Sequence, residues 1–194
     1  EWAPDGRGFA FTAIDPEPEE VETARKEKRD VILADQVFRY APLYRQDFDF
    51  PSREIPEATP LTEGAFHVTG FDWSPDGAGI VFAHQADPRI NTGRLSGDIS
   101  VVRIEDRQTR ILVDGTGVES SPLISPDGRW VAFLSTGERI EPVGLDDVYL
   151  VPFEGGEVRK LAETMDRSPA LLAWSGDGRQ IFVQEAIRTT QQLL

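Results

Sequence analysis

The sequence predicts an all-β fold of repeated antiparallel sheets, and three observations lead to this prediction. A motif close to Trp-Ser-Pro-Asp-Gly occurs four times in the 194 residues. Its aspartates are separated by 71, 51 and 50 residues, which indicates a tandem repeat. Apolar residues then follow each copy at every second position, the pattern of a β-strand with one buried face.

The motif itself predicts a tight turn. Its copies are residues 2–6, 73–77, 124–128 and 174–178. Serine at the first position, proline at the second and glycine at the fourth favour a type I turn, and aspartate is tolerated at the third. A calcium loop needs several alternating oxygen ligands, whereas each copy supplies one aspartate, so we expect no metal site. The residues with a structural turn role are Asp5, Gly6, Asp76, Gly77, Asp127, Gly128, Asp177 and Gly178.

Each repeat predicts a four-stranded sheet. After the strand on either side of the turn, further strands are expected at residues 98–104 and 109–113, and again at 147–153 and 157–161. Four strands in a repeat of about 50 residues are typical of a β-propeller blade. The sequence therefore predicts a β-propeller fragment of about three and a half four-stranded blades, with one short helical insertion in the first blade.

The blade boundaries follow from the repeat. We expect blade 1 over residues 1–65, blade 2 over 66–117, blade 3 over 118–166 and an incomplete blade 4 over 167–194. Blade 1 is long because of an insertion at 16–35, where early acids and later bases predict a helix over residues 18–30. The chain should end just after the second strand of blade 4. Since propellers close with about four to eight blades, we expect a longer parent chain.

Composition and charge exclude several classes of protein. With 20 Lys and Arg against 34 Asp and Glu, the net charge is −14, which disfavours nucleic acids and anionic membrane surfaces as partners. No apolar run is long enough to cross a bilayer, so no membrane insertion is expected. The absence of cysteine excludes disulfides and thiolate chemistry. We expect no cofactor, and a cytoplasmic location with a periplasmic one as the alternative.

The repeated turn, followed by an Ile-x-Phe type of strand, resembles the propeller repeats of two families. One comprises TolB-like propellers, and the other the amino-terminal propellers of prolyl oligopeptidase family serine peptidases. The charged insertion after Asp15 and the segment 61–77 are more similar to the acylaminoacyl- and dipeptidyl-peptidase-like members. This resemblance implies a propeller that caps the active site of an α/β-hydrolase domain in the same parent chain and filters peptide substrates. The TolB-like alternative implies a protein-binding module without a peptidase domain.

The chain itself offers no catalytic residue. No serine has glycine both two residues before and two residues after it, as a nucleophile elbow requires. Few residues could act as a general base, because the sequence has two histidines, His67 and His84. We expect His84 to lie at the surface of a loop.

Five residues are candidates for substrate binding. In dipeptidyl-peptidase-like relatives an acidic pair on a propeller insertion holds the substrate's amino terminus, and this implies such a role for the early glutamates of the insertion. The alternative is that these acids only complement a helix dipole. Two arginines in the loop before the third strand of blade 2 would contact a peptide carboxylate or carbonyl, or else be solvated. The candidates are Glu17, Glu19, Glu20, Arg89 and Arg94.

Overall fold

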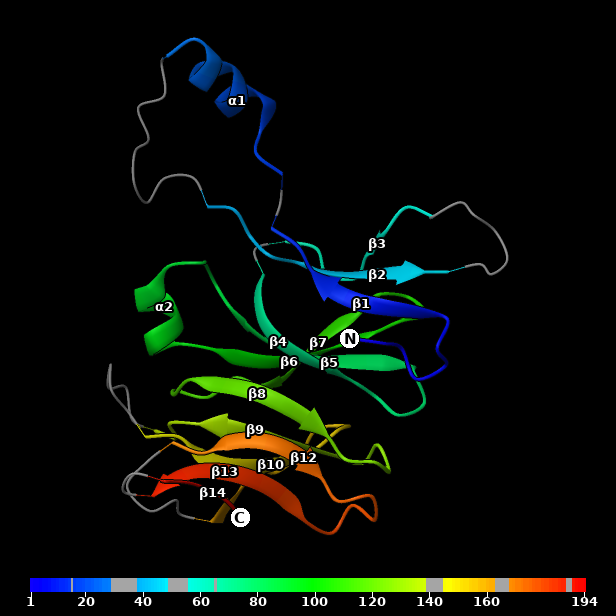
Figure 1. Ribbon diagram of the computed structural model, residues 1–194, viewed down its shortest axis with the longest axis vertical. Coiled ribbons are helices and arrows are strands. Elements are labelled where there is room, and N and C mark those ends of the chain that lie inside the picture. Colours follow the sequence, from blue (N-terminus) through cyan, green and yellow to red (C-terminus); the bar gives the residue numbers. More distant parts are fainter. Residues whose placement is uncertain are drawn as a thin grey trace.

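The computed structural model describes residues 1–14, 16–28, 38–48, 56–64, 66–138, 145–162, 168–187 and 190–194. These residues form four antiparallel sheets in which strands pair in chain order (Figure 1). The first sheet contains β1 (Gly8–Thr12), β2 (Leu43–Asp47) and β3 (Thr59–Pro60). The second contains β4 (His67–Trp73), β5 (Gly79–Gln85), β6 (Asp98–Arg103) and β7 (Thr109–Val113). The third contains β8 (Glu119–Ile124), β9 (Trp130–Ser135), β10 (Asp147–Pro152) and β11 (Arg159–Ala162). The fourth contains β12 (Ala170–Trp174), β13 (Ile181–Ile187) and β14 (Thr190–Leu193).

The four sheets are stacked face to face in chain order (Figure 1). β4 contacts β8, and β8 contacts β12, so the first strands of the second, third and fourth sheets lie side by side. This is the arrangement of neighbouring propeller blades around their axis. The predicted fold class, an all-β propeller fragment, is confirmed.

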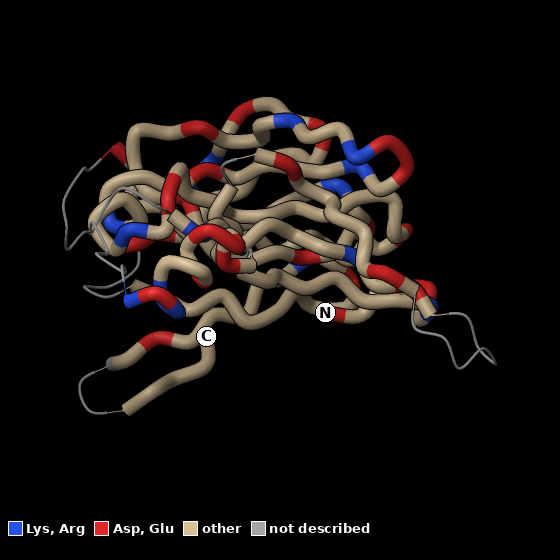
Figure 2. Tube along the Cα trace, turned by 90° about the horizontal axis from the view of Figure 1, so that it is seen from above, with Lys and Arg blue, Asp and Glu red and all other residues tan. Residues whose placement is uncertain are grey.

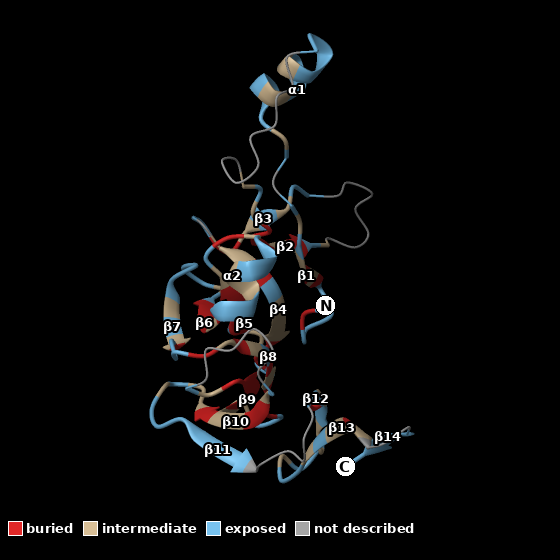
Figure 3. Cartoon of the chain, turned by 90° about the vertical axis from the view of Figure 1, so that its left-hand side faces the viewer, coloured by how far each residue is buried: buried red, intermediate tan, exposed pale blue. Residues whose placement is uncertain are grey.

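Side chains between the sheets form the core. One apolar cluster lies between the first and second sheets and includes Leu43, Ile80 and Phe82. A second cluster lies between the second and third sheets and includes Val81 and Val131. Successive residues of β5 thus point into different clusters, which is why this central strand is apolar on both faces. Figure 3 shows the buried residues concentrated in the second and third sheets.

The described residues also form two helices. α1 (Glu19–Lys26) is shorter than the predicted 18–30, because Lys28 has a left-handed backbone with φ of +57°. α1 is the predicted helical insertion of the first blade, whereas α2 (Ile90–Leu95) lies in the second blade, in a segment that was predicted as a polar loop. Its Gly93 is a poor helix former, and no side chain caps its start. A Cβ at Gly93 would lie 2.1 Å from Gln85 Oε1, so this glycine lets α2 pack against the end of β5.

The fourth sheet also has one strand more than predicted. The chain was expected to end just after the second strand, but β14 pairs with β13. All four residues of β14 are exposed, and three of them are polar. Without alternating apolar residues, the sequence carries no signal for a strand there.

The connections between strands define two opposite faces. The turn face carries the four motif turns at residues 3–8, 74–79, 125–130 and 175–180. Because neighbouring strands are antiparallel, the connections that follow β1, β5 and β9 leave from the other end of the sheets. We call this end the insertion face. α1 follows β1 and α2 follows β5, so both helices belong to the insertion face (Figure 1).

The acidic residues occur along the whole course of the chain rather than in one block (Figure 2). Lys and Arg residues are interspersed among them (Figure 2). None of the described helices is long and apolar enough to span a membrane.

Candidate functional site

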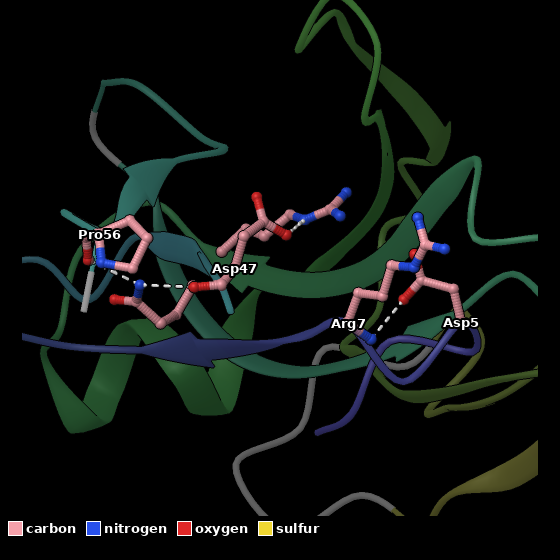
Figure 4. A network of polar contacts seen from close by, with 6 residues as sticks. Asp5, Arg7, Asp47 and Pro56 are labelled. Atoms are coloured by element: carbon pink, nitrogen blue, oxygen red, sulfur yellow. Dashed lines mark hydrogen bonds and ion pairs between the residues drawn. The ribbon is translucent and has the colours of Figure 1, made fainter. Parts of the chain in front are cut away.

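The four motif turns share one backbone geometry. In each, the amide of the glycine donates a hydrogen bond to the carbonyl three residues earlier, at 2.8–2.9 Å. The glycines Gly6, Gly77, Gly128 and Gly178 have φ between +67° and +72°, a region that other residues rarely adopt. In the first turn, the Arg7 amide donates to Asp5 Oδ1 at 2.9 Å (Figure 4). In each turn, the aspartate thus accepts a hydrogen bond from the backbone amide two residues after it.

Serine completes this network in three of the four turns. In the third turn, the Ser125 hydroxyl donates to Asp127 Oδ1 at 2.6 Å and accepts from the Trp130 amide at 3.0 Å. Ser74 and Ser175 make equivalent bonds, whereas the first turn has Ala3. The hydroxyl of Ser125 is the main cause that lowers the pKa of Asp127 to about 2.

The turns also contact one another from sheet to sheet. A Cβ on Gly128 would lie 3.6 Å from Pro75 Cδ of the preceding turn. The corresponding distances are 3.9 Å from Gly77 to Pro4 and 3.8 Å from Gly178 to Pro126. The motif turns of successive sheets therefore lie close to one another along the turn face. Among the described residues, no group of three or more His, Asp or Glu side chains could hold a metal ion.

On the insertion face, the predicted glutamates lie in the first turn of α1 and just before it. Glu17 forms a bidentate ion pair with Arg25, at 2.6 and 2.8 Å, and so is already neutralised. Glu19 and Glu20 are exposed in the first turn of α1. Figures 1 and 3 show α1 standing away from the sheets, and it has no buried residue.

The predicted arginines lie at α2. Arg89 pairs with the buried Asp87, with Nη2 2.6 Å from Oδ2, and its guanidinium lies over the Phe38 ring at 5.2 Å. This pairing holds the pKa of Asp87 well below its usual range. Arg94 is exposed. An open cavity of about 810 Å³ is lined by Arg89 and by apolar residues of α2, including Ile90.

His84 is buried rather than at the surface, which corrects the sequence-based expectation. It lies within β5, is 8% exposed, and packs against the rings of Phe66 and Phe82. Burial lowers its pKa. Its Nε2 is 2.8 Å from Ser100 Oγ, but Ser100 is also fully buried and no substrate can reach it. This contact is therefore structural and does not form a nucleophile with its base.

A group of acids that sequence reasoning missed lies between the second and third sheets on the insertion face. Asp98 begins β6, Asp114 follows β7 and Glu119 begins β8. We call these three residues the acidic junction. The Glu119 carboxylate packs directly on Gly115, where a Cβ would lie 2.5 Å from its Oε1. None of the three acids stands out in the sequence, because the sheet pairing is what places them at neighbouring strand ends.

Comparison with known proteins relates the chain to peptidases. No protein-family model matches it. Dipeptidyl-peptidase 5 of Arthroderma otae is 27% identical over 164 residues, which cover 77% of this chain and 23% of that protein. Dipeptidyl-peptidase 5 of Trichophyton equinum is 31% identical over 78 residues, 40% of this chain and 11% of that protein. The chain thus spans less than a quarter of either relative.

Solved structures share the fold. A putative TolB from Agrobacterium tumefaciens is 25% identical, with a TM-score of 0.57 over 91% of this chain and 53% of its own. A puromycin-hydrolyzing peptidase of Mycobacterium tuberculosis is 18% identical, with a TM-score of 0.62 over 95% of this chain and 27% of its own. The predicted resemblance to peptidase propellers, with TolB-like propellers second, is confirmed. The chain is a propeller segment that is similar in sequence to dipeptidyl-peptidases.

Proposed function

We propose that this chain is the non-catalytic propeller segment of a serine peptidase, and that its insertion face caps the active site and filters peptide substrates. One observation carries the proposal: both helices, the α2 cavity and the acidic junction all lie on one face. The opposite face repeats one turn four times. Binding residues concentrate on variable loops held by a rigid scaffold, and the insertion face has this character.

The partner of this face would be an α/β-hydrolase domain of the parent protein. The contact between Ser100 and His84 is buried, and no serine of the sequence lies in a nucleophile elbow, so the proposal assigns the chemistry to another part of the parent protein. The α2 cavity and the exposed Arg94 would then border the path of the peptide. The role of the propeller is to restrict access to the active site.

Site-directed labelling of the full-length protein tests this role. The chain has no cysteine, so Arg94→Cys introduces a single thiol on the insertion face. Arg179→Cys is the matched control, because Arg179 is an exposed arginine of the fourth motif turn. Any cysteines elsewhere in the protein are first replaced by serine, and both variants are coupled to a polyethylene-glycol maleimide.

We expect the label at position 94 to lower kcat/KM for long peptides far more than for dipeptide substrates, and the label at 179 to change neither. Equal effects of the two labels would contradict the proposed capping face. A second candidate function, a protein-binding module without peptidase activity, is favoured by the match to the putative TolB. It predicts no peptide hydrolysis by the unlabelled full-length protein.

A further inference from the structure

Two connections of the insertion face meet at Arg89. The connection after β1 returns to β2 through residues 38–42, and the connection after β5 runs through residues 86–97 and carries α2. They leave the first and second sheets, which share one apolar cluster. The guanidinium of Arg89 lies over the ring of Phe38, 5.2 Å from the ring centre. We call Phe38, Asp87 and Arg89 the connection joint.

The buried Asp87 fixes the orientation of Arg89. Its Oδ1 accepts hydrogen bonds from the Arg89 amide at 2.9 Å and from Nε at 3.0 Å. Its Oδ2 accepts a third from Nη2 at 2.6 Å. A bidentate pair holds the plane of a guanidinium in one direction. Phe38 therefore packs against an oriented cation rather than against a freely rotating side chain.

Backbone hydrogen bonds anchor the connection joint on both sides. In the first connection, the Ala41 carbonyl accepts a hydrogen bond from the Val68 amide of β4 at 3.1 Å. In the second, the Arg89 carbonyl accepts the first hydrogen bond of α2, from the Gly93 amide at 3.1 Å. A displacement of either connection must therefore disturb the contact between Arg89 and Phe38.

The turn face contains a similar pair in a more exposed setting. Asp127 accepts hydrogen bonds from the Arg129 amide at 3.1 Å and from its Nε at 2.7 Å, again with one residue between the two. The side chains of Asp127 and Arg129 are 42% and 77% exposed, whereas those of Asp87 and Arg89 are 11% and 49% exposed. An arginine two residues after an aspartate is thus a local feature of both places. What distinguishes Arg89 is its greater burial and its contact with a neighbouring sheet's connection.

We propose that Arg89 is a positioning residue, which joins the two connections into one unit and thereby sets the size of peptide that the insertion face admits. The mechanical joint follows from the contacts of Arg89, whereas its effect on peptide size rests on the proposed function. This role differs from the predicted direct contact of Arg89 with a peptide carboxylate or carbonyl. Two side-chain nitrogens of Arg89 already donate to Asp87, and Phe38 covers one face of the guanidinium.

Amide hydrogen exchange of the full-length protein tests the joint without any hydrolysis. Phe38→Leu removes the ring from the first connection, and we expect faster exchange of the Gly93 amide, which is hydrogen-bonded within α2. Arg89→Met removes the cation from the second connection, and we expect faster exchange of the Val68 amide, which is hydrogen-bonded to the first. Each rise should be about fivefold, the effect of losing one exposed cation–π contact.

Two controls separate the contact from general damage to the fold. Phe38→Tyr keeps an aromatic ring at the connection joint and should leave the exchange of the Gly93 amide unchanged. Arg129→Met removes the arginine of the matching pair on the turn face and should leave the exchange of the Val68 amide unchanged.

Kinetics of the full-length protein then test the effect on peptide size. Loosened connections admit long peptides more readily, so we expect Phe38→Leu and Arg89→Met each to raise the ratio of kcat/KM for long peptides to that for dipeptide substrates. The rise should be about threefold or more. Arg129→Met should leave this ratio unchanged. A direct contact of Arg89 with the substrate would instead raise KM for dipeptides in Arg89→Met and not in Phe38→Leu.

The proposal is overturned if a variant of one connection leaves the exchange of the other unchanged, or if Arg129→Met speeds exchange as Arg89→Met does. It is also overturned if the ratio for long peptides stays constant in an active peptidase, or if Arg89→Met alone raises KM for dipeptides. Coupled exchange in a full-length protein without peptidase activity would contradict the proposed function and leave the connection joint intact. Uncoupled exchange in an active, correctly gated peptidase would contradict the connection joint alone.

Discussion

The turn face and the insertion face lie at opposite ends of the same strands, and their connections differ: one face repeats a single turn, and the other carries connections that differ from sheet to sheet. At the turn face, each sheet repeats one hairpin, in which an aspartate, a positive-φ glycine and, in three cases, a serine satisfy one another. At the insertion face, the connections carry a charged helix after β1 and a short helix beside an open cavity after β5. Repetition at one end therefore fixes the scaffold, while variation at the other end supplies binding surfaces.

The largest effect should come from breaking the repeated turn. Gly128→Val places a β-branched residue at φ of +72° and brings its side chain against Pro75. We expect a loss of about 1–3 kcal/mol in the free energy of unfolding, measured with urea. Gly176→Val is the control: this glycine also lies in a motif turn, but no atom lies within 4 Å of its Cβ position and its φ is not positive. Similar losses in the two variants would show that strain is not the cause.

The serine network offers a reciprocal test. Ser125→Ala removes the acceptor of the Trp130 amide, and we expect it to cost about 1–3 kcal/mol. Ala3→Ser adds the missing hydroxyl to the first turn, and we expect a gain of about 0.5–1.5 kcal/mol. Both changes are measured by denaturant unfolding. A destabilising Ala3→Ser would mean that the first turn is not equivalent to the others.

Acids on the two faces should respond to pH with opposite signs. Asp127 has a lowered pKa of about 2, so its contribution to stability is present above the ordinary aspartate range and is lost as the pH falls toward 2. Glu119 has a raised pKa, so the contribution of its protonated form is present in acid and is lost as the pH rises through that pKa. We therefore expect Asp127→Asn to destabilise at pH 7 and Glu119→Gln to stabilise. Unfolding curves between pH 3 and 8 should show both differences shrinking toward low pH, and equal signs at neutral pH would refute the comparison.

The smallest effect is expected at α1. Glu19→Gln with Glu20→Gln should change KM for free-amino peptides by less than about fivefold in the full-length protein, because exposed charges contribute at most about 1 kcal/mol. N-blocked peptides are the control substrates. A rise of about tenfold or more that is confined to free-amino peptides would instead give these glutamates the role of holding the substrate's amino terminus.

The same contrast explains how far the sequence could predict the molecule. Turns and strands were predictable where local chemistry repeats, as at Pro75 and Ile80, because turn geometry and strand alternation depend on near neighbours. α2 was not predicted, because Gly93 disfavours a helix and its packing against Gln85 is known only from the structure. The burial of His84 and the unpaired oxygen of Glu119 depend on residues from neighbouring strands and sheets. The binding residues predicted from the sequence were therefore charged residues of the insertion and of a loop. The buried Glu119 was not among them, because its burial depends on the packing of neighbouring strands.

The contact between proline and glycine in successive turns has a consequence for how such a molecule can grow. The second and third motifs each place their proline toward the next repeat and their glycine toward the previous one, as Pro75 and Gly77 do toward Gly128 and Pro4. The interface is thus heterologous, with a head and a tail encoded in five consecutive residues. Duplicating one repeat in the gene would therefore supply both the proline and the glycine that the interface with the next repeat needs. In the fourth motif, Gly176 stands in place of the proline, so a repeat joined there must dock without this forward half.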